Sequence, residues 1–308
     1  MSNALTIRAL TKTYANDFHA LKGVDLSVVE GDFFALLGSN GAGKTTMIGI
    51  ICGLLEKTAG EITILGLNQS DNISKVKSLI GLMPQEFNFD PFEPIEEILI
   101  NQAGYHGIER GQARKNAEEF LKRVELWDKR RDKANSLSGG MKRRLMLARA
   151  LIHKPKVLIL DEPSAGVDVE IRRSMWAFLK ELNEGGMTII LTTHYLEEAE
   201  SLCRNIAIVN NGKVVEQTSM KRLLAQVSQQ VLILESAKKL TDIPTDLEFS
   251  MTQLDEYSLK ATVESSVSIT QVLQILSQKG IEIAHVRNAQ NRLETLFLNL
   301  VRPLHKYE

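Results

Sequence analysis

Short apolar runs alternate with helical patterns along the first two thirds of the chain. Five of these runs have the pattern of strands: 5–10, 24–29, 33–38, 157–161 and 188–193. Residues 46–55 are apolar nearly all round, which is typical of a buried helix. Continuous runs of β-branched residues and leucine, separated by helical patterns, predict a parallel sheet that is covered on both faces.

Two further segments interrupt this pattern. Between Gln85 and Arg149 the sequence turns helical and rich in charge, which predicts a helical segment inserted between the strands. Residues 205–217 predict a hairpin, because Asn211 and Gly212 suit the positive φ of a tight turn.

A second unit is predicted after the polar stretch 226–230. Its strand-like runs are 231–236, 257–264 and 281–286. Residues 268–278 predict a helix that begins with a Ser268–Gln271 capping box and ends at Gly280. A final amphipathic helix is marked by Leu293, Leu296, Phe297 and Leu300. This small α+β module of about 80 residues carries no residue pattern that we connect with catalysis.

Composition narrows the class of protein further. The chain has 308 residues, 44% of them hydrophobic and 24% charged, as in ordinary globular proteins. Its 37 basic and 38 acidic side chains argue against binding nucleic acid by bulk charge. With only two cysteines, Cys52 and Cys203, the chain lacks a disulfide framework, which favours a reducing cytosol. The sequence has neither a secretory signal nor an uncharged stretch of roughly 18 residues, so we expect a soluble protein that can dock on a membrane without crossing it.

The segment that begins at Gly38 matches the phosphate-loop pattern G-x-x-x-x-G-K-[ST], with a predicted strand before it and a predicted helix after it. Its glycines let successive N–H groups converge on phosphate oxygens, and the helix N-terminus adds partial positive charge. Lys44 is expected to reach the β- and γ-phosphates and the Thr45 hydroxyl to bind Mg²⁺. The expected nucleotide contacts from this loop are Gly38, Ser39, Asn40, Gly41, Ala42, Gly43, Lys44, Thr45 and Thr46.

Two carboxylates follow the apolar run 157–160. A carboxylate at the C-terminal end of a buried strand lies at the phosphate crevice of an open α/β sheet. Asp161 is therefore the expected Mg²⁺ partner, and Glu162 the expected base or orienter of the attacking water. Taken alone, such a run is also compatible with a strand that ends in a solvated turn. The accompanying phosphate loop favours the functional interpretation.

Residues 137–141, Leu-Ser-Gly-Gly-Met, are not a feature of phosphate-loop proteins in general. Together with the phosphate loop, Gln85 and His194, this segment resembles the ATP-binding cassette (ABC) ATPases over roughly residues 5–222. Its motif sequences are most similar to those of the YadG-like ATPase subunits of type-2 ABC exporters. The resemblance implies a P-loop NTPase fold of the ABC type, an α/β fold with a mixed sheet core, an antiparallel β subdomain and an inserted helical subdomain, plus the small C-terminal α+β domain.

The resemblance also implies domain limits and roles for particular residues. The ATPase domain is expected at 1–225, with its helical subdomain at about 86–150, and the accessory domain at 231–308. On one side of the nucleotide, the implied residues are Tyr14 on the adenine ring, Gln85 between Mg²⁺ and the attacking water, Asp161 on the metal, Glu162 as base and His194 on the γ-phosphate. From the opposite subunit, Ser138, Gly139 and Gly140 are implied to cover the γ-phosphate, and Asp168 to cross the dimer interface.

Several positions depart from the common pattern of the family or have a second interpretation. Met141 replaces the usual Gln, Ser39 a common Pro and Val167 a frequent Leu. Taken one at a time, these residues also have interpretations without function: Tyr14 as a packed aromatic side chain, Gln85 as a surface amide, and His194 as the residue that ends a strand. The basic run 142–144 is expected to be a solvated or ion-paired helix face rather than a nucleic-acid contact. Two interpretations of Phe87, Phe89 and Phe92 stay open: a docking surface for a membrane subunit, or the core of the helical subdomain.

The sequence therefore predicts the ATP-hydrolysing subunit of an ABC transporter, of exporter type, which converts ATP and water to ADP and phosphate with Mg²⁺. Its expected partners are a second copy of the chain and an integral membrane permease of the type-2 exporter kind, on the cytoplasmic face of the cell membrane, with no nucleic acid. A soluble ABC ATPase of translation or DNA repair and an importer subunit are the alternatives. The single cassette and the lack of a long heptad repeat between the phosphate loop and residue 137 favour the transporter.

Overall fold

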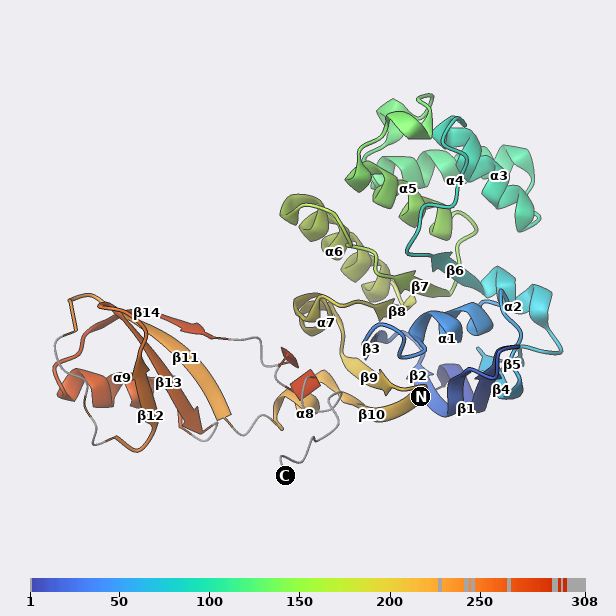
Figure 1. Ribbon diagram of the computed structural model, residues 1–308. Coiled ribbons are helices and arrows are strands. Elements are labelled where there is room, and N and C mark those ends of the chain that lie inside the picture. The colour runs from blue at the N-terminus through green and yellow to red at the C-terminus, as the bar shows by residue number, and fades with distance from the viewer. Residues whose placement is uncertain are drawn as a thin grey trace. The chain divides into compact units, whose positions relative to one another are not determined.

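The computed structural model describes residues 2–226, 229–240, 244, 247–264, 267–289, 293–294 and 296–297. Contacts divide the chain into two compact units, Met1–Thr218 and Ser219–Glu308 (Figure 1). The first unit contains two sheets and an inserted set of helices. The second contains a four-stranded sheet and the helices α8 (Met220–Leu224) and α9 (Ile269–Gln278).

The larger sheet of the first unit has six strands in the order β10-β9-β3-β8-β7-β6. Its strands are β3 (Phe33–Gly38), β6 (Ile80–Met83), β7 (Val157–Asp161), β8 (Thr188–Thr192), β9 (Asn205–Asn210) and β10 (Lys213–Ser219). The pairs β3–β8, β3–β9, β6–β7 and β7–β8 are parallel, as the continuous apolar runs predict. Asn211 and Gly212, both at positive φ, form the predicted turn between β9 and β10.

The smaller sheet is antiparallel, in the order β2-β1-β4-β5. It consists of β1 (Asn3–Thr13), β2 (His19–Val29), β4 (Ala59–Ile64) and β5 (Leu67–Asn68). The helix α1 (Lys44–Ile51) shares one buried apolar cluster with side chains of both sheets, Met47, Leu5 and Ile159 among them. Burial of this α1 surface holds the start of the helix at the C-terminal end of β3.

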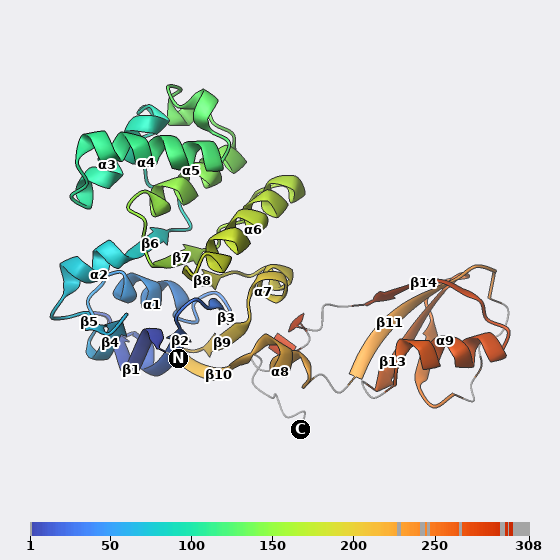
Figure 2. The ribbon, with the colours of Figure 1, turned by 180° about the vertical axis from the view of Figure 1, so that it is seen from behind.

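The helical segment lies between β6 and β7 in the chain, as the sequence predicts. It comprises α3 (Ile95–Tyr105), α4 (Arg110–Arg123), the 3-10 turns η1 (Trp127–Lys129) and η2 (Ala134–Ser136), and α5 (Gly139–Leu151). Figures 1 and 2 show α3, α4 and α5 gathered beyond β6 at one end of the first unit. The remaining helices of this unit are α2 (Ile73–Leu79), α6 (Val169–Glu184) and α7 (Leu196–Leu202).

The second unit contains α8 (Met220–Leu224) and an antiparallel sheet in the order β12-β13-β11-β14. Its strands are β11 (Gln229–Ser236), β12 (Ser250–Gln253), β13 (Ser258–Glu264) and β14 (Ile283–Asn288). Val272 and Leu276 of α9 (Ile269–Gln278) pack against the sheet. The capping box of Ser268 and Gln271 is confirmed, and Gly280 has the expected positive φ of +82°. Strand β12 was not predicted.

The last predicted helix is described in part: residues 293, 294, 296 and 297 are helical, and Leu300 lies outside the described residues. Within the described part of the chain, no helix combines the length and apolarity that spanning a membrane requires.

Candidate functional site

The phosphate loop joins β3 to α1, and two of its glycines have no room for a side chain. A Cβ on Gly38 would lie 2.5 Å from the carbonyl oxygen of Val209. Gly43 caps α1 at a φ of +108°, and a Cβ there would lie 2.9 Å from the Ala20 oxygen. Glycine at these positions lets the backbone curl tightly into the N-terminus of α1, the end at which a helix presents N–H groups to an anion.

Lys44 places its ammonium inside the curl of this loop. Its Nζ donates hydrogen bonds to the carbonyl oxygens of Gly38, at 2.8 Å, and Ser39, at 3.1 Å. Burial lowers the pKa of Lys44, while the nearby carboxylates of Glu162 and Asp161 oppose that effect. The site thus holds a cation between the loop and two acids.

Tyr14 and Phe18 lie beside the loop. The Tyr14 hydroxyl is 3.2 Å from Oγ1 of Thr46, and the two aromatic rings stack with centroids 6.4 Å apart. The Lys12 ammonium lies 5.1 Å from the Tyr14 ring centroid. Phe18 is the more exposed of the two aromatic side chains, with 56% of its surface exposed. The sequence analysis does not predict Phe18 as a site residue, and the one feature that could have indicated it is its position four residues after Tyr14.

Asp161 ends β7 and is almost fully buried. Burial raises the pKa of its carboxyl group, and a hydrogen bond from Thr192 Oγ1 to its Oδ1 opposes this effect. Thr192 is not among the residues that the sequence predicts for the site. The parallel pairing of β7 with β8 places Thr192 beside Asp161 at the same edge of the sheet, and that pairing would have indicated its role.

Two of the predicted catalytic residues, Gln85 and His194, contact the carboxylate of the third, Glu162, although the three lie in separate segments of the chain. Nε2 of Gln85 donates to Oε2 of Glu162 at 3.0 Å, and Nδ1 of His194 lies 3.1 Å from Oε1 of the same side chain. The Glu162 backbone has a φ of +52° and its N–H donates to the Thr192 oxygen at 3.0 Å. Both carboxylate oxygens are thus oriented by a neighbour, and a left-handed backbone turns the side chain out of the strand.

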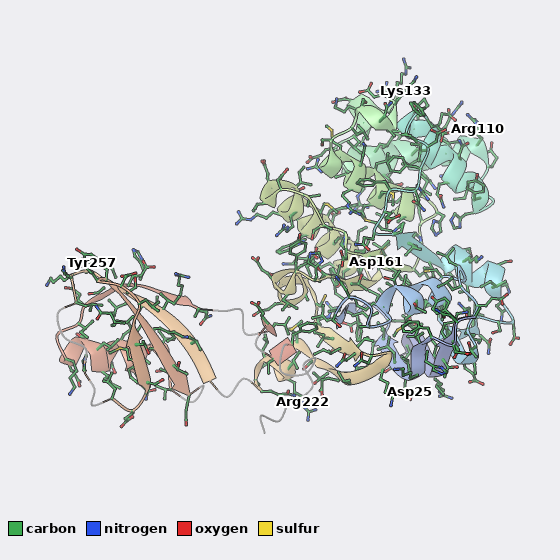
Figure 3. All side chains as sticks on the ribbon, viewed as in Figure 1. Asp25, Arg110, Lys133, Asp161, Arg222 and Tyr257 are labelled. Carbon is green, nitrogen blue, oxygen red and sulfur yellow. The ribbon has the colours of Figure 1, made fainter. Side chains whose placement is uncertain are left out.

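These elements surround an open cavity of about 410 Å³. Its walls are Phe18, Ala20, Asn40, Gly41, Gly43, Lys44, Thr45, Thr46, Gln85, Asp161 and Glu162. Figure 3 labels Asp161 within the first unit. Of the other predicted residues, Gly38, Ser39 and Ala42 shape the loop, Tyr14 contacts Thr46, and His194 contacts Glu162 without lining the cavity.

The segment 137–141 lies elsewhere. Ser138 is the N-cap of α5, where its Oγ accepts a hydrogen bond from the Met141 N–H at 3.3 Å. Ser138 and Gly139 are exposed, whereas Gly140 is buried and a Cβ on it would meet Ile171 Cδ1 at 2.3 Å. None of the described residues that line the cavity belongs to this segment.

Asp168 caps a second helix, α6. Its Oδ1 accepts a hydrogen bond from the Ile171 N–H at 2.8 Å, and its side chain is exposed. The next residue, Val169, is 60% exposed, an unusual exposure for valine. Like Ser138, Asp168 does not line the cavity of its own chain.

The expectation for the basic run 142–144 needs correction, because the run is not simply a solvated or ion-paired face: Arg144 pairs with Glu125, but Arg143 is buried. Of the two interpretations left open for the three phenylalanines, their exposure disfavours the core: Phe87 and Phe92 are 44% and 66% exposed and Phe89 is only half-buried.

A glycine loop between a strand and a helix, with carboxylates at the end of a neighbouring parallel strand, defines a P-loop nucleotide-binding ATPase. The sequence profile of the family described as "ABC transporter" matches residues 21–165. The linearmycin resistance ATP-binding protein LnrL of Bacillus subtilis is 34% identical over 91% of this chain and 93% of its own length. The chain therefore belongs to the ABC transporter ATPases and is an ATP-binding, ATP-hydrolysing subunit of such a transporter.

Other relatives and solved structures agree. The daunorubicin resistance ATP-binding protein DrrA3 of Streptomyces coeruleorubidus is 34% identical, and the match covers 96% of this chain and 95% of that protein. The Nod factor export ATP-binding protein I of Burkholderia thailandensis is 38% identical over 68% and 69% of the two chains. A dimeric ATP-binding cassette in a post-hydrolysis state with ADP and Pi shares 30% identity at a TM-score of 0.65, covering 70% of this chain and 98% of that one.

Proposed function

We propose that two copies of this chain bind ATP at a shared boundary and supply the energy for an exporter. One chain contributes the phosphate loop, and the other contributes Ser138, Gly139 and Gly140. The observation that carries this proposal is the exposure of Ser138 and Gly139 at the start of α5, away from the cavity that the loop lines. The solved dimer of a similar cassette with ADP and Pi supports it.

Within one chain, each group around the cavity has a role that its chemistry favours. The loop N–H groups and Lys44 bind the phosphates, because a helix N-terminus and a buried ammonium both attract anions. Glu162 accepts the proton of the attacking water, held in place by Gln85 and His194. Tyr14 stacks on adenine, beside the exposed ring of Phe18.

The cavity also fits Mg²⁺. The Thr45 hydroxyl, the Asp161 carboxylate and the Gln85 amide oxygen are hard oxygen donors on its wall. No group of three or more His, Cys, Asp and Glu that could hold a metal occurs among the described residues, which agrees with a cation held largely by substrate phosphates. When bound, Mg²⁺ supplies charge neutralisation at the β- and γ-phosphates.

The second copy completes the site. Ser138, Gly139 and Gly140 present a hydroxyl and N–H groups at the exposed start of α5, a site suited to an anion such as the γ-phosphate. Asp168, exposed at the start of α6, crosses the same boundary. ATP then closes the dimer, and hydrolysis reopens it by removing the phosphate that bridges the two chains.

Mixing two inactive variants tests this arrangement. Lys44→Ala disables the phosphate loop and Ser138→Arg blocks the other half of the site, so each homodimer has two defective sites. A mixed dimer has one site with both defects and one intact site. With random exchange, half of the dimers are mixed and each has one working site, so ATP hydrolysis is expected to recover to roughly one quarter of the wild-type rate.

The matched control mixes Lys44→Ala with Glu162→Gln. Lys44 and Glu162 line the same cavity of one chain, so every site in that mixed dimer keeps one defect and no recovery is expected. Failure of the first mixture to recover, after exchange of labelled subunits has been demonstrated, would contradict a site shared between copies.

The membrane partner is proposed to dock where the helical segment meets the sheet. There, a second cavity of about 240 Å³ is lined by Leu54, Leu82, Gln102, His106, Arg149 and seven other residues. Exposed apolar side chains occur in the same segments: Leu54 at 65%, Phe92 at 66% and Tyr105 at 86%. Such an exposed apolar set supports the docking interpretation of Phe87 and Phe92 over a role in the core.

Leu54→Glu is expected to reduce the fraction of the chain that sediments with membranes when its permease is present, because it adds a charge to an apolar surface. Hydrolysis by the purified chain should stay near the wild-type rate, since Leu54 does not line the nucleotide cavity. Leu254→Glu, at a leucine with 51% exposure in the second unit, is the control for residue type. Equal membrane fractions for Leu54→Glu and wild type would argue against this surface.

The outward direction of transport and the cytoplasmic face of the cell membrane are part of the same proposal. They are supported by the names of the relatives, which refer to linearmycin and daunorubicin resistance and to Nod factor export.

A further inference from the structure

Arg143 is a buried cation that the proposed reaction has not yet used. It lies on α5, five residues after Ser138, and only 8% of it is exposed. Neighbouring Arg144 extends to Glu125 and Ser174 instead. Removing a guanidinium from water is unfavourable unless its donors are used, and burial lowers the pKa of Arg143. Its contacts therefore show what the fold gains from it.

Both hydrogen bonds of Arg143 are made to backbone oxygens of other segments. Nη1 donates to the Gln85 oxygen at 2.6 Å, and Nε donates to the Ala165 oxygen at 3.3 Å. The guanidinium also lies 4.9 Å from the ring centroid of Phe87, two residues after Gln85. One side chain thus joins the helix that begins at Ser138 to two loops.

Each of these loops carries residues of the candidate site. Arg143 donates to the backbone oxygen of Gln85, and the side chain of the same residue donates to Glu162 at 3.0 Å. Ala165 lies between Glu162 and Asp168, and its N–H donates to the backbone carbonyl oxygen of Glu162 at 3.2 Å. The Arg143 guanidinium therefore links α5 to the side chain that contacts the Glu162 carboxylate and to the loop that follows the Glu162 backbone.

We propose that Arg143 is a positioning residue, which links the start of α5 to Gln85 and to the 162–168 loop and so places Gln85 against Glu162. This inference rests on the proposed function of Gln85 and Glu162. Arg143 does not line the nucleotide cavity, so it acts through Gln85 rather than on ATP. The planar fork of arginine suits two acceptors on different loops, and lysine offers only a compact charge.

The test compares steady-state hydrolysis by the purified full chain and three variants. Arg143→Met should lower kcat by about 10- to 100-fold, the scale of a misplaced catalytic group. Its KM for ATP should change by less than roughly threefold, because the phosphate contacts remain. Arg143→Lys should recover part of kcat, since it can still donate to the Gln85 oxygen. Arg114→Met removes the same charge from an exposed position of α4 and should stay within about twofold of wild type.

A double-mutant cycle then separates positioning from a general loss of stability. If Arg143 acts by placing Gln85, adding Arg143→Met to Gln85→Ala should change kcat by less than about twofold. The Tm of each variant is measured alongside, and if Arg143→Met does not fold, Arg143→Lys takes its place in the cycle. Losses that multiply, a wild-type kcat for Arg143→Met, or a change confined to KM would overturn the inference.

The outcome also distinguishes this inference from the proposed function. A wild-type rate for Gln85→Ala alone would overturn the role of Gln85, and the positioning role of Arg143 would fall with it. A slow Gln85→Ala with multiplying losses would leave the role of Gln85 intact and overturn only that of Arg143.

Discussion

Glu162→Gln is expected to lower the rate of ATP hydrolysis by at least about 10²- to 10⁴-fold while ATP binding is retained. A positioned general base contributes a factor of this size, and an amide cannot accept the proton from water. The substitution keeps the size of the side chain and one oxygen for Gln85 or His194, so the geometry of the cavity should persist. Single-turnover hydrolysis and sedimentation in ATP measure the two effects, and an ATP-bound dimer should accumulate.

The control for this change is Glu184→Gln, at an exposed carboxylate at the end of α6. It removes the same charge away from the cavity and should hydrolyse ATP at close to the wild-type rate. Hydrolysis at the wild-type rate by Glu162→Gln would remove Glu162 from its proposed role, since no other change accompanies the loss of the carboxylate.

Lys44→Ala is expected to weaken ATP binding by about 30-fold or more. A hydrogen bond to a charged group contributes about 1.5–3 kcal/mol, and each 1.4 kcal/mol is a factor of ten in affinity. In the present structure the ammonium bonds to Gly38 and Ser39 inside the loop, which holds it where phosphates would arrive. Calorimetric titration with ATP measures the affinity directly.

Lys180→Ala, at an exposed lysine of α6, provides the matched control and should leave the affinity unchanged. Retention of wild-type affinity by Lys44→Ala would mean that the loop N–H groups bind the phosphates without the ammonium. The two variants should differ: Lys44→Ala should bind ATP more weakly, and Glu162→Gln should bind ATP but hydrolyse it very slowly.

The local parts of this architecture could be predicted from the sequence because short segments determine them. The buried strands β3, β7 and β8, the phosphate loop and the 211–212 turn all follow from continuous apolar runs or from glycine positions. Strands β4, β5, β6 and β12 were missed. The last three have at most four residues, which are too few to establish a period, and β4 has only two buried apolar side chains, Ile62 and Ile64.

Contacts between distant segments were harder to predict. No pattern within a single helix or strand predicts the Gln85–Glu162 contact or the Thr192–Asp161 contact, because the order of the strands in the sheet brings these residues together. The interpretation of the basic run failed at Arg143 for a geometric reason. Consecutive residues of a helix point about 100° apart, so three successive basic side chains cannot all face solvent on a helix that packs on one side.

The close approach of Gly140 to Ile171 has a consequence for the rate of the proposed association of two chains. It joins the first turns of α5 and α6, and the bond from Arg144 to Ser174 joins them again one turn later. Ser138 and Asp168, the caps of these two helices, are therefore displayed together as one preorganised surface. Little conformational entropy remains to be lost on encounter, so association of ATP-loaded chains should be limited by diffusion and orientation rather than by loop ordering.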